Sequence, residues 1–138
     1  MRTTFDPRSA ALLAKHAARI QGSGHELAAL GEADPELAGD CGVEICSLEA
    51  RTILASGAPA RVVAMAGEAA RRGQPTSIET ADMEAVSRLE QVVSLGSSRI
   101  ALKLSALEAQ AAQEPTVRMG SLMGLATGAV GLFKTFFP

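Results

Sequence analysis

The sequence contains no tryptophan and no tyrosine, and phenylalanine occurs at only four of its 138 positions. Hydrophobic residues still make up 47% of the chain. The core must therefore be built from Leu, Ile, Val, Met and many alanines, which favours closely approaching helices. No stretch alternates with a period of two and is rich in β-branched residues, so we expect no strand. The sequence predicts an all-α fold of four to five helices in an antiparallel bundle.

The chain also lacks an excess of basic residues. Its formal net charge is −2, its pI is near 5.7, and its only basic cluster is Arg71-Arg72. Binding to DNA or RNA needs several lysines or arginines on one face to neutralise phosphates. We therefore expect no nucleic-acid partner.

Cysteine is scarce, with Cys41 and Cys46 as its two positions. In the helix expected there, a spacing of five turns the side chains about 140° apart and puts the Cα atoms beyond about 8 Å. That distance is too long for a disulfide, so we expect two reduced, buried thiols, which suit a cytoplasmic protein. The first twenty residues lack an apolar core and a small-residue cleavage site, so no secretory signal is expected.

Local signals predict where the helices lie. Asp6-Pro7 and Asp34-Pro35 are typical helix starts, since a carboxylate caps free amides and proline fits the first turn. Gly73 follows two arginines, as at a helix end. We expect helices over 7–31 (with a bend or early end at 22–24), 35–56, 59–72 and 80–113. Thr76 with Glu79 fits a capping box, with Thr80 as the rival cap.

The pattern is strongest over 80–113. Besides its main apolar stripe, Val92, Leu95 and Leu102 form a second one, so the apolar face is wide enough for two neighbouring helices. Residues 96–98 (Gly-Ser-Ser) indicate either a bend or a close approach by another helix. In the 35–56 helix, the residues predicted to share one stripe are Leu37, Cys41, Ile45, Leu48 and Thr52.

Signatures of catalysis and metal binding are missing from the sequence. Ser23 lies between two glycines but lacks the context of a nucleophile elbow, and is expected to be a polar interruption of the helix. His16 and His25 fall on opposite sides of a continuous helix. Asp40 and Glu44, one turn apart, have no Glu-x-x-His partner and predict a solvated face. We therefore expect no enzyme activity, no cofactor and no metal.

The most informative segment is 115–138, expected to be a separate helix after a 1–114 bundle domain. Residues 119–133 carry no charge, and four helical glycines would cost about 1 kcal/mol each against alanine. The glycines fall within an arc of about 80°, and their small-xxx-small spacing lets helix backbones approach closely. The predicted interaction residues are Gly120, Gly124, Gly128 and Gly131 on one face, with Leu122, Leu125, Phe133, Phe136 and Phe137 on the other.

Three interpretations of this segment stay open. In the first, the bulky face docks in the bundle and the glycine face packs on another helix, often of another subunit; in the second, the segment inserts in a membrane; in the third, it is a loose extension. Fifteen uncharged residues span only about 22 Å, less than a hydrocarbon core of about 30 Å, and a longer span includes Lys134, so interfacial placement is the easier membrane form. We expect a structural or adaptor protein that associates with itself or with another helical protein. The alternatives are a peripheral membrane protein and a small enzyme or metal-binding bundle.

Overall fold

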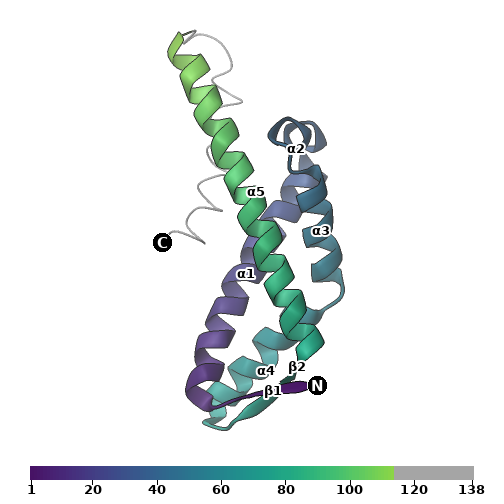
Figure 1. The fold of residues 1–138 in the computed structure, drawn as a ribbon, viewed down its shortest axis with the longest axis vertical. Helices are drawn as coiled ribbons and strands as arrows, with labels where there is room; N and C mark the ends of the chain where they lie inside the picture. The colour runs from purple at the N-terminus through teal and green to yellow at the C-terminus, as the bar shows by residue number, and fades with distance from the viewer. Residues whose placement is uncertain (114–138) are drawn as a thin grey trace.

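Helices dominate the structure, a computed structural model that describes residues 1–113. The elements are, in order, β1 (Arg2–Phe5), α1 (Pro7–Ala33), α2 (Pro35–Cys41), α3 (Glu44–Ala55), α4 (Ala58–Arg72), β2 (Thr76–Glu79) and α5 (Thr80–Gln113). The predicted all-α bundle is confirmed, and the 80–113 helix has the expected bounds. In Figure 1, α1 and α5 rise in the same direction from the end that carries the sheet, and α3 and α4 run back.

The expectation of no strand was wrong. β1 and β2 form an antiparallel pair in which Arg2 lies opposite Glu79 and Phe5 opposite Thr76. Ile78, which is fully buried, anchors the pair to the core. Each strand has only one apolar residue, Phe5 in β1 and Ile78 in β2, so neither shows an alternating pattern. The two strands also lie more than seventy positions apart in the sequence. Thr76, expected to cap a helix, instead begins β2.

α1 is one continuous helix through residues 22–24, which settles the question that its glycines left open. Its first turn is capped as predicted: the Asp6 carboxylate accepts a hydrogen bond from the Ser9 amide at 2.7 Å, and proline follows at the first position. Gly24 is buried under Leu89 of α5; a Cβ added there would lie 3.0 Å from the leucine Cδ1. The glycine therefore makes room for a neighbouring side chain and does not end the helix.

The helix expected over 35–56 is broken at residues 42 and 43. Gly42 adopts a left-handed conformation (φ 70°), and the next amide, that of Val43, bonds back to the carbonyl of Ala38 at 2.9 Å. This is a typical glycine-terminated helix end. Because α3 begins anew after the break, the predicted stripe was wrong: Ile45 and Leu48 are exposed, with side chains 69% and 53% accessible. The core face of α3 consists of Cys46, Ser47 and Ala50.

The ends of α4 follow the sequence closely. Gly57, with a φ of 78°, separates it from α3, and Gly73, with a φ of 64°, ends it, as expected. α4 packs mainly along α1.

The core has two parts, both aliphatic and rich in alanine. The first lies among α1, α2, α3 and α5, and the second among α1, α4, β2 and α5. The buried members of the first are Ile20, Leu27, Ala38, Cys41, Val43, Cys46, Ala50, Leu89, Val92, Val93 and Ile100. Those of the second are Ala10, Ala17, Val62, Ala66, Ala69, Ile78 and Val86.

α1 and α5 cross in Figure 1, and two reciprocal glycine–leucine contacts join them. Leu89 of α5 covers Gly24 of α1, and Leu27 of α1 covers Gly96 of α5, where an added Cβ would lie 2.9 Å from the Leu27 Cδ2. Of the two readings of residues 96–98, close approach by another helix is therefore the observed one. Beyond the crossing, α5 continues past the other helices.

Candidate functional site

The nine interaction residues predicted from the sequence lie outside the described residues, so the structure places none of them. They are Gly120, Gly124, Gly128, Gly131, Leu122, Leu125, Phe133, Phe136 and Phe137. That site stays a prediction. The surface that residues 1–113 offer for contact is therefore built here from their own side chains.

Two polar contacts form one seam with α5, one from α3 and one from Gly42 in the break between α2 and α3. The Arg88 guanidinium lies 3.3 Å from the Glu49 carboxylate, and the Arg99 guanidinium donates to the Gly42 carbonyl at 2.6 Å. Residues four apart share a helix face, so Ile45 lies beside Glu49 on α3. The same spacing places Leu95 beside Arg99 on α5, next to the seam.

Three apolar side chains form what we call the seam patch: Ile45, Leu95 and Leu102. Their accessible fractions are 69%, 48% and 73%. Leu95 and Leu102 lie two turns apart, hence on one side of α5. The sequence predicted a second apolar stripe here, and its third member, Val92, is buried at 7%. Within the described part of the chain, the two leucines of this stripe are left largely uncovered.

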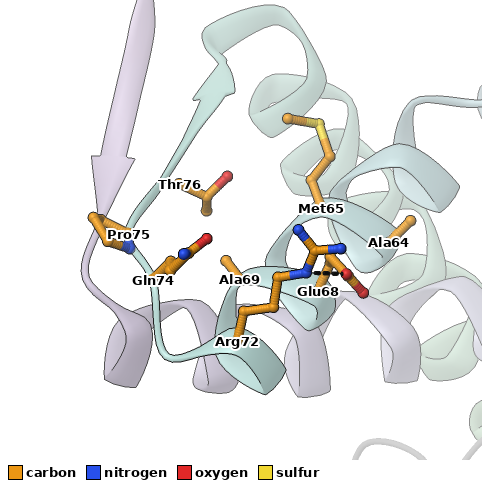
Figure 2. Close-up of a pocket in the computed structure, with 8 residues that line it drawn as sticks. All are labelled: Ala64, Met65, Glu68, Ala69, Arg72, Gln74, Pro75 and Thr76. Carbon is orange, nitrogen blue, oxygen red and sulfur yellow. Dashed lines mark ion pairs between the residues drawn. The ribbon is translucent and has the colours of Figure 1, made fainter.

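A shallow pocket lies between α4 and the segment that leads into β2 (Figure 2). Its volume is about 520 Å³, and Met65, Glu68 and Arg72 line its α4 side. The Glu68 carboxylate pairs with Arg72 at 2.6 Å and with Arg71. The hydrogen bond from Arg71 is the main cause that lowers the pKa of Glu68. Two guanidinium groups share one carboxylate, so this rim of the pocket is cationic and partly neutralised.

A bidentate ion pair fastens the start of α4 to the start of α5. The Arg61 Nε and Nη2 atoms donate to the two Asp82 carboxylate oxygens at 3.2 and 3.0 Å. The Asp82 side chain is only 13% accessible. The hydrogen bond from Arg61 holds its pKa below the ordinary value. Glu79, at the end of β2, is also paired: its carboxylate lies 2.9 Å from the Arg2 guanidinium of β1.

The two cysteines are free and buried, as predicted, although the geometry behind that prediction was wrong. Cys41 ends α2 and Cys46 lies in α3, so no single helix carries both. Burial raises the pKa of each thiol above its ordinary value.

The remaining polar candidates are dispersed. His16 reaches Glu90 of α5 at 2.6 Å, and His25 lies exposed farther along α1. Ser23 is buried within the continuous helix α1, so the predicted polar interruption of the helix is wrong; among the described residues its hydroxyl has no hydrogen-bond partner.

The two acidic residues expected one turn apart do not share a helix. Asp40 belongs to α2 and Glu44 begins α3, and both side chains are exposed.

Over residues 1–113, no three histidine, cysteine or acidic side chains are grouped so that they could hold a metal ion. Among the helices that the structure describes, none combines the length and hydropathy needed to span a membrane. No family model, curated protein or solved structure matches the chain.

Proposed function

We propose that this chain is a non-enzymatic structural or adaptor protein that works by helix–helix association. The glycine face of its C-terminal segment, Gly120, Gly124, Gly128 and Gly131, is the assembly surface. The partner is a second copy of the chain or another helical protein. Leu122, Leu125, Phe133, Phe136 and Phe137 form the opposite, bulky face of that segment.

One observation carries the proposal: the described helices already pack through glycines. Gly24 and Gly96 each receive a leucine from the facing helix, and Gly31 of α1 lies directly against Ser47 of α3. A glycine within a helix costs about 1 kcal/mol relative to alanine, and close packing offsets that cost. The four glycines of the C-terminal segment carry the same cost. A neighbouring helix on their face offsets it in the same way.

The placement of α5 also supports the proposal. α5 is 34 residues long and extends past the other helices (Figure 1). Its last residue, Gln113, therefore starts the C-terminal segment away from the sheet end of the molecule.

The test is the solution mass of the full chain, measured by size-exclusion chromatography with light scattering and without detergent. We expect a defined oligomer. Gly124→Leu combined with Gly128→Leu should dissolve it, because overpacking a close interface costs roughly 1–3 kcal/mol per site. The matched control is Gly22→Leu, since Gly22 is exposed and a Cβ there meets nothing within 4 Å. A double variant that assembles like the parent chain would refute the glycine face as the interface.

The same samples distinguish the membrane alternative. If the parent chain forms no oligomer but sediments with phospholipid vesicles, and the double variant does so equally well, the segment is an anchor. In that case the phenylalanines and leucines of the bulky face carry the function, and the assembly proposal is wrong.

A further inference from the structure

We propose that two copies of this chain contact each other head to tail, with the basic outer face of α1 in one copy seated on an acidic hollow at the α2–α3 corner of the next. The inference goes beyond the proposed function, because both surfaces belong to residues 1–113 and neither includes the glycine face. The partner is thus a second copy of the chain, recognised by complementary charge.

The first surface is what we call the basic face, on the solvent side of the first half of α1. It consists of Arg8, Leu12, Lys15 and Arg19, which recur at steps of four, three and four and so fall within an arc of about 60°. All four side chains are exposed, and Leu12 is 71% accessible. Within residues 1–113, none of the three cations forms an ion pair. The face therefore presents one apolar side chain surrounded by uncompensated positive charge.

The second surface is what we call the corner hollow, a depression of about 90 Å³ where the end of α1 meets α2 and α3. The lining residues that bear on the contact are Glu32, Pro35, Ala38, Glu44, Leu48 and Arg51. Leu48 is 53% accessible, so the hollow offers apolar surface to a leucine from outside. Arg51 is already paired with Glu32 at 2.9 Å, which leaves the Glu44 carboxylate as the free charge of the lining.

Further carboxylates surround the hollow. A Cβ added to Gly39 of α2 would lie 2.5 Å from the Glu44 Oε1 atom, so this glycine leaves space for the carboxylate to lie over α2. Glu36 and Asp40 are four positions apart, hence on one face of α2, and both are exposed. In the part of the chain that the structure describes, neither of them forms an ion pair, and nor does Glu44. The corner is therefore acidic beyond what its own cations neutralise.

The two surfaces carry opposite charge because the sequence separates its charges. Residues 7–25 hold three lysines or arginines and no carboxylate, whereas residues 26–50 hold seven carboxylates and no lysine or arginine. α1 begins beside the sheet, and α2 lies at the other end of the bundle (Figure 1). Two copies that point the same way, one shifted along the bundle, therefore bring the basic face of one beside the corner hollow of the next. Complementary potentials attract and orient such a pair.

The contact joins two different surfaces, so it is heterologous and repeats from copy to copy. One leucine and a few exposed charges bury much less than the roughly 1,200–2,000 Å² of a stable interface. We therefore expect an association that is weak on its own and that dilute chromatography does not detect. Between copies that the glycine face already holds together, the high local concentration strengthens it.

The experiment uses the full chain carrying Gly124→Leu and Gly128→Leu, so that the glycine face does not contribute. Sedimentation equilibrium measures its weight-average mass at rising protein concentration, in low salt and in about 1 M NaCl. We expect the mass to rise with concentration in low salt. It should stay that of a monomer at about 1 M salt, where the Debye length falls to about 3 Å.

Charge reversal identifies the two surfaces. Lys15→Glu with Arg19→Glu makes the basic face acidic, and Glu36→Lys with Asp40→Lys makes the corner basic. Each variant alone should associate at least tenfold more weakly than its parent, because like charges then meet. An equimolar mixture of the two should associate again, because the intact basic face of the second variant meets the intact hollow of the first. A surface that binds only itself does not give this pattern.

Two matched controls make the same changes of net charge elsewhere. They are Arg71→Glu with Arg72→Glu on α4, and Glu84→Lys with Glu108→Lys on α5, all at exposed positions. Alone and mixed, they should associate like the parent. Circular dichroism checks the fold of every variant. Should the corner variant fail to fold, Leu12→Glu on the exposed face of α1 makes the same test from the other surface.

Two results would overturn the inference: charge-reversal variants that each associate as the parent does, or a mixture that stays monomeric. A third result would replace it. If the parent forms no complex with itself but sediments with vesicles that contain phosphatidylserine, and Lys15→Glu with Arg19→Glu abolishes this, the basic face meets a membrane surface and the head-to-tail contact is wrong.

The outcome separates this inference from the proposed function. An oligomer that the glycine substitutions dissolve, with no dependence of mass on concentration in the glycine variant, refutes the head-to-tail contact alone. A salt-sensitive rise in mass that the charge reversals abolish, in a chain that dilute chromatography shows as a monomer even with its native glycines, supports the contact and refutes the glycine-face assembly.

Discussion

Gly31 of α1 lies so close to Ser47 of α3 that a Cβ added to the glycine would come within 2.6 Å of the serine Cβ. The Ser47 hydroxyl also donates to the Ala28 carbonyl of α1 at 3.3 Å. The backbone of α1 at Gly31 therefore contacts the Ser47 side chain of α3. The two helices approach this closely because glycine has no Cβ. Because Ser47 Cβ belongs to the base of its side chain, a rotamer change cannot relieve the contact.

From this contact we expect Gly31→Ala to destabilise the fold by roughly 1–3 kcal/mol, despite the better helix propensity of alanine. Adding Ser47→Gly should restore part of the loss by reopening the space. Gly22→Ala, where a Cβ meets nothing within 4 Å, should instead stabilise the fold by about 0.5–1 kcal/mol. Urea unfolding of the four chains checks this; equal midpoints for Gly31→Ala and Gly22→Ala would contradict it.

The short sheet should contribute to stability through one buried side chain. Ile78 of β2 is fully buried in the second core cluster, so Ile78→Ala should cost about 2–5 kcal/mol. Thr3, its exposed partner in the register, is the control, and Thr3→Ala should change stability little. Thermal unfolding followed by circular dichroism gives both values. A small loss for Ile78→Ala would mean that the sheet is not fixed to the core.

The Arg61–Asp82 pair should make stability depend on acid pH. The pKa of Asp82 is lowered in the folded state from an ordinary value of 3.8. Its contribution to the free energy of unfolding is therefore fully present above about pH 4 and is lost as the pH falls through the folded pKa. Asp82→Asn should be less stable than the parent at pH 6, and the difference should shrink toward pH 2. Glu84→Gln, on the exposed side of the same turn, is the control.

The two thiols should be slow to react in the folded protein. Cys41 and Cys46 are buried, and burial raises the pKa of both, which lowers the fraction of reactive thiolate. We expect a thiol reagent such as Ellman's reagent to label them at pH 8 only as fast as the helices open. Labelling should therefore accelerate steeply with urea. Rapid labelling of either thiol in native buffer would show that the α2–α3 corner opens on its own.

Sequence alone could predict the features that local chemistry decides. The bounds of α5 follow from a long run of apolar residues at helical spacing. Asp6-Pro7 marks the start of α1, and Gly73 marks the end of α4. The sheet could not be foreseen, because pairing between Phe5 and Thr76 depends on how α1 and α4 pack.

The break after α2 could not be predicted from the sequence, for a different reason. Gly31 and Gly39 lie within helices while Gly42 ends one, and only the tertiary contacts distinguish them. Val43 could be buried only after that break, and its burial turned Ile45 outward. The same limit applies to the seam patch. Its position depends on which side of α5 faces α3, and the spacing of apolar residues along one helix does not determine that side.

The β1–β2 pair also fixes where the amino terminus leaves the molecule. Thr80, the first residue of α5, donates its amide to the Met1 carbonyl at 3.0 Å, so the chain begins beside the start of that helix. Gln113 lies at its far end, about 50 Å away at 1.5 Å per residue. An affinity tag or fluorescent protein fused ahead of Met1 therefore lies at the opposite end of α5 from residue 113. Such a fusion leaves the far end of α5 unobstructed by the tag, and a pair of dyes at the two positions measures the length of α5.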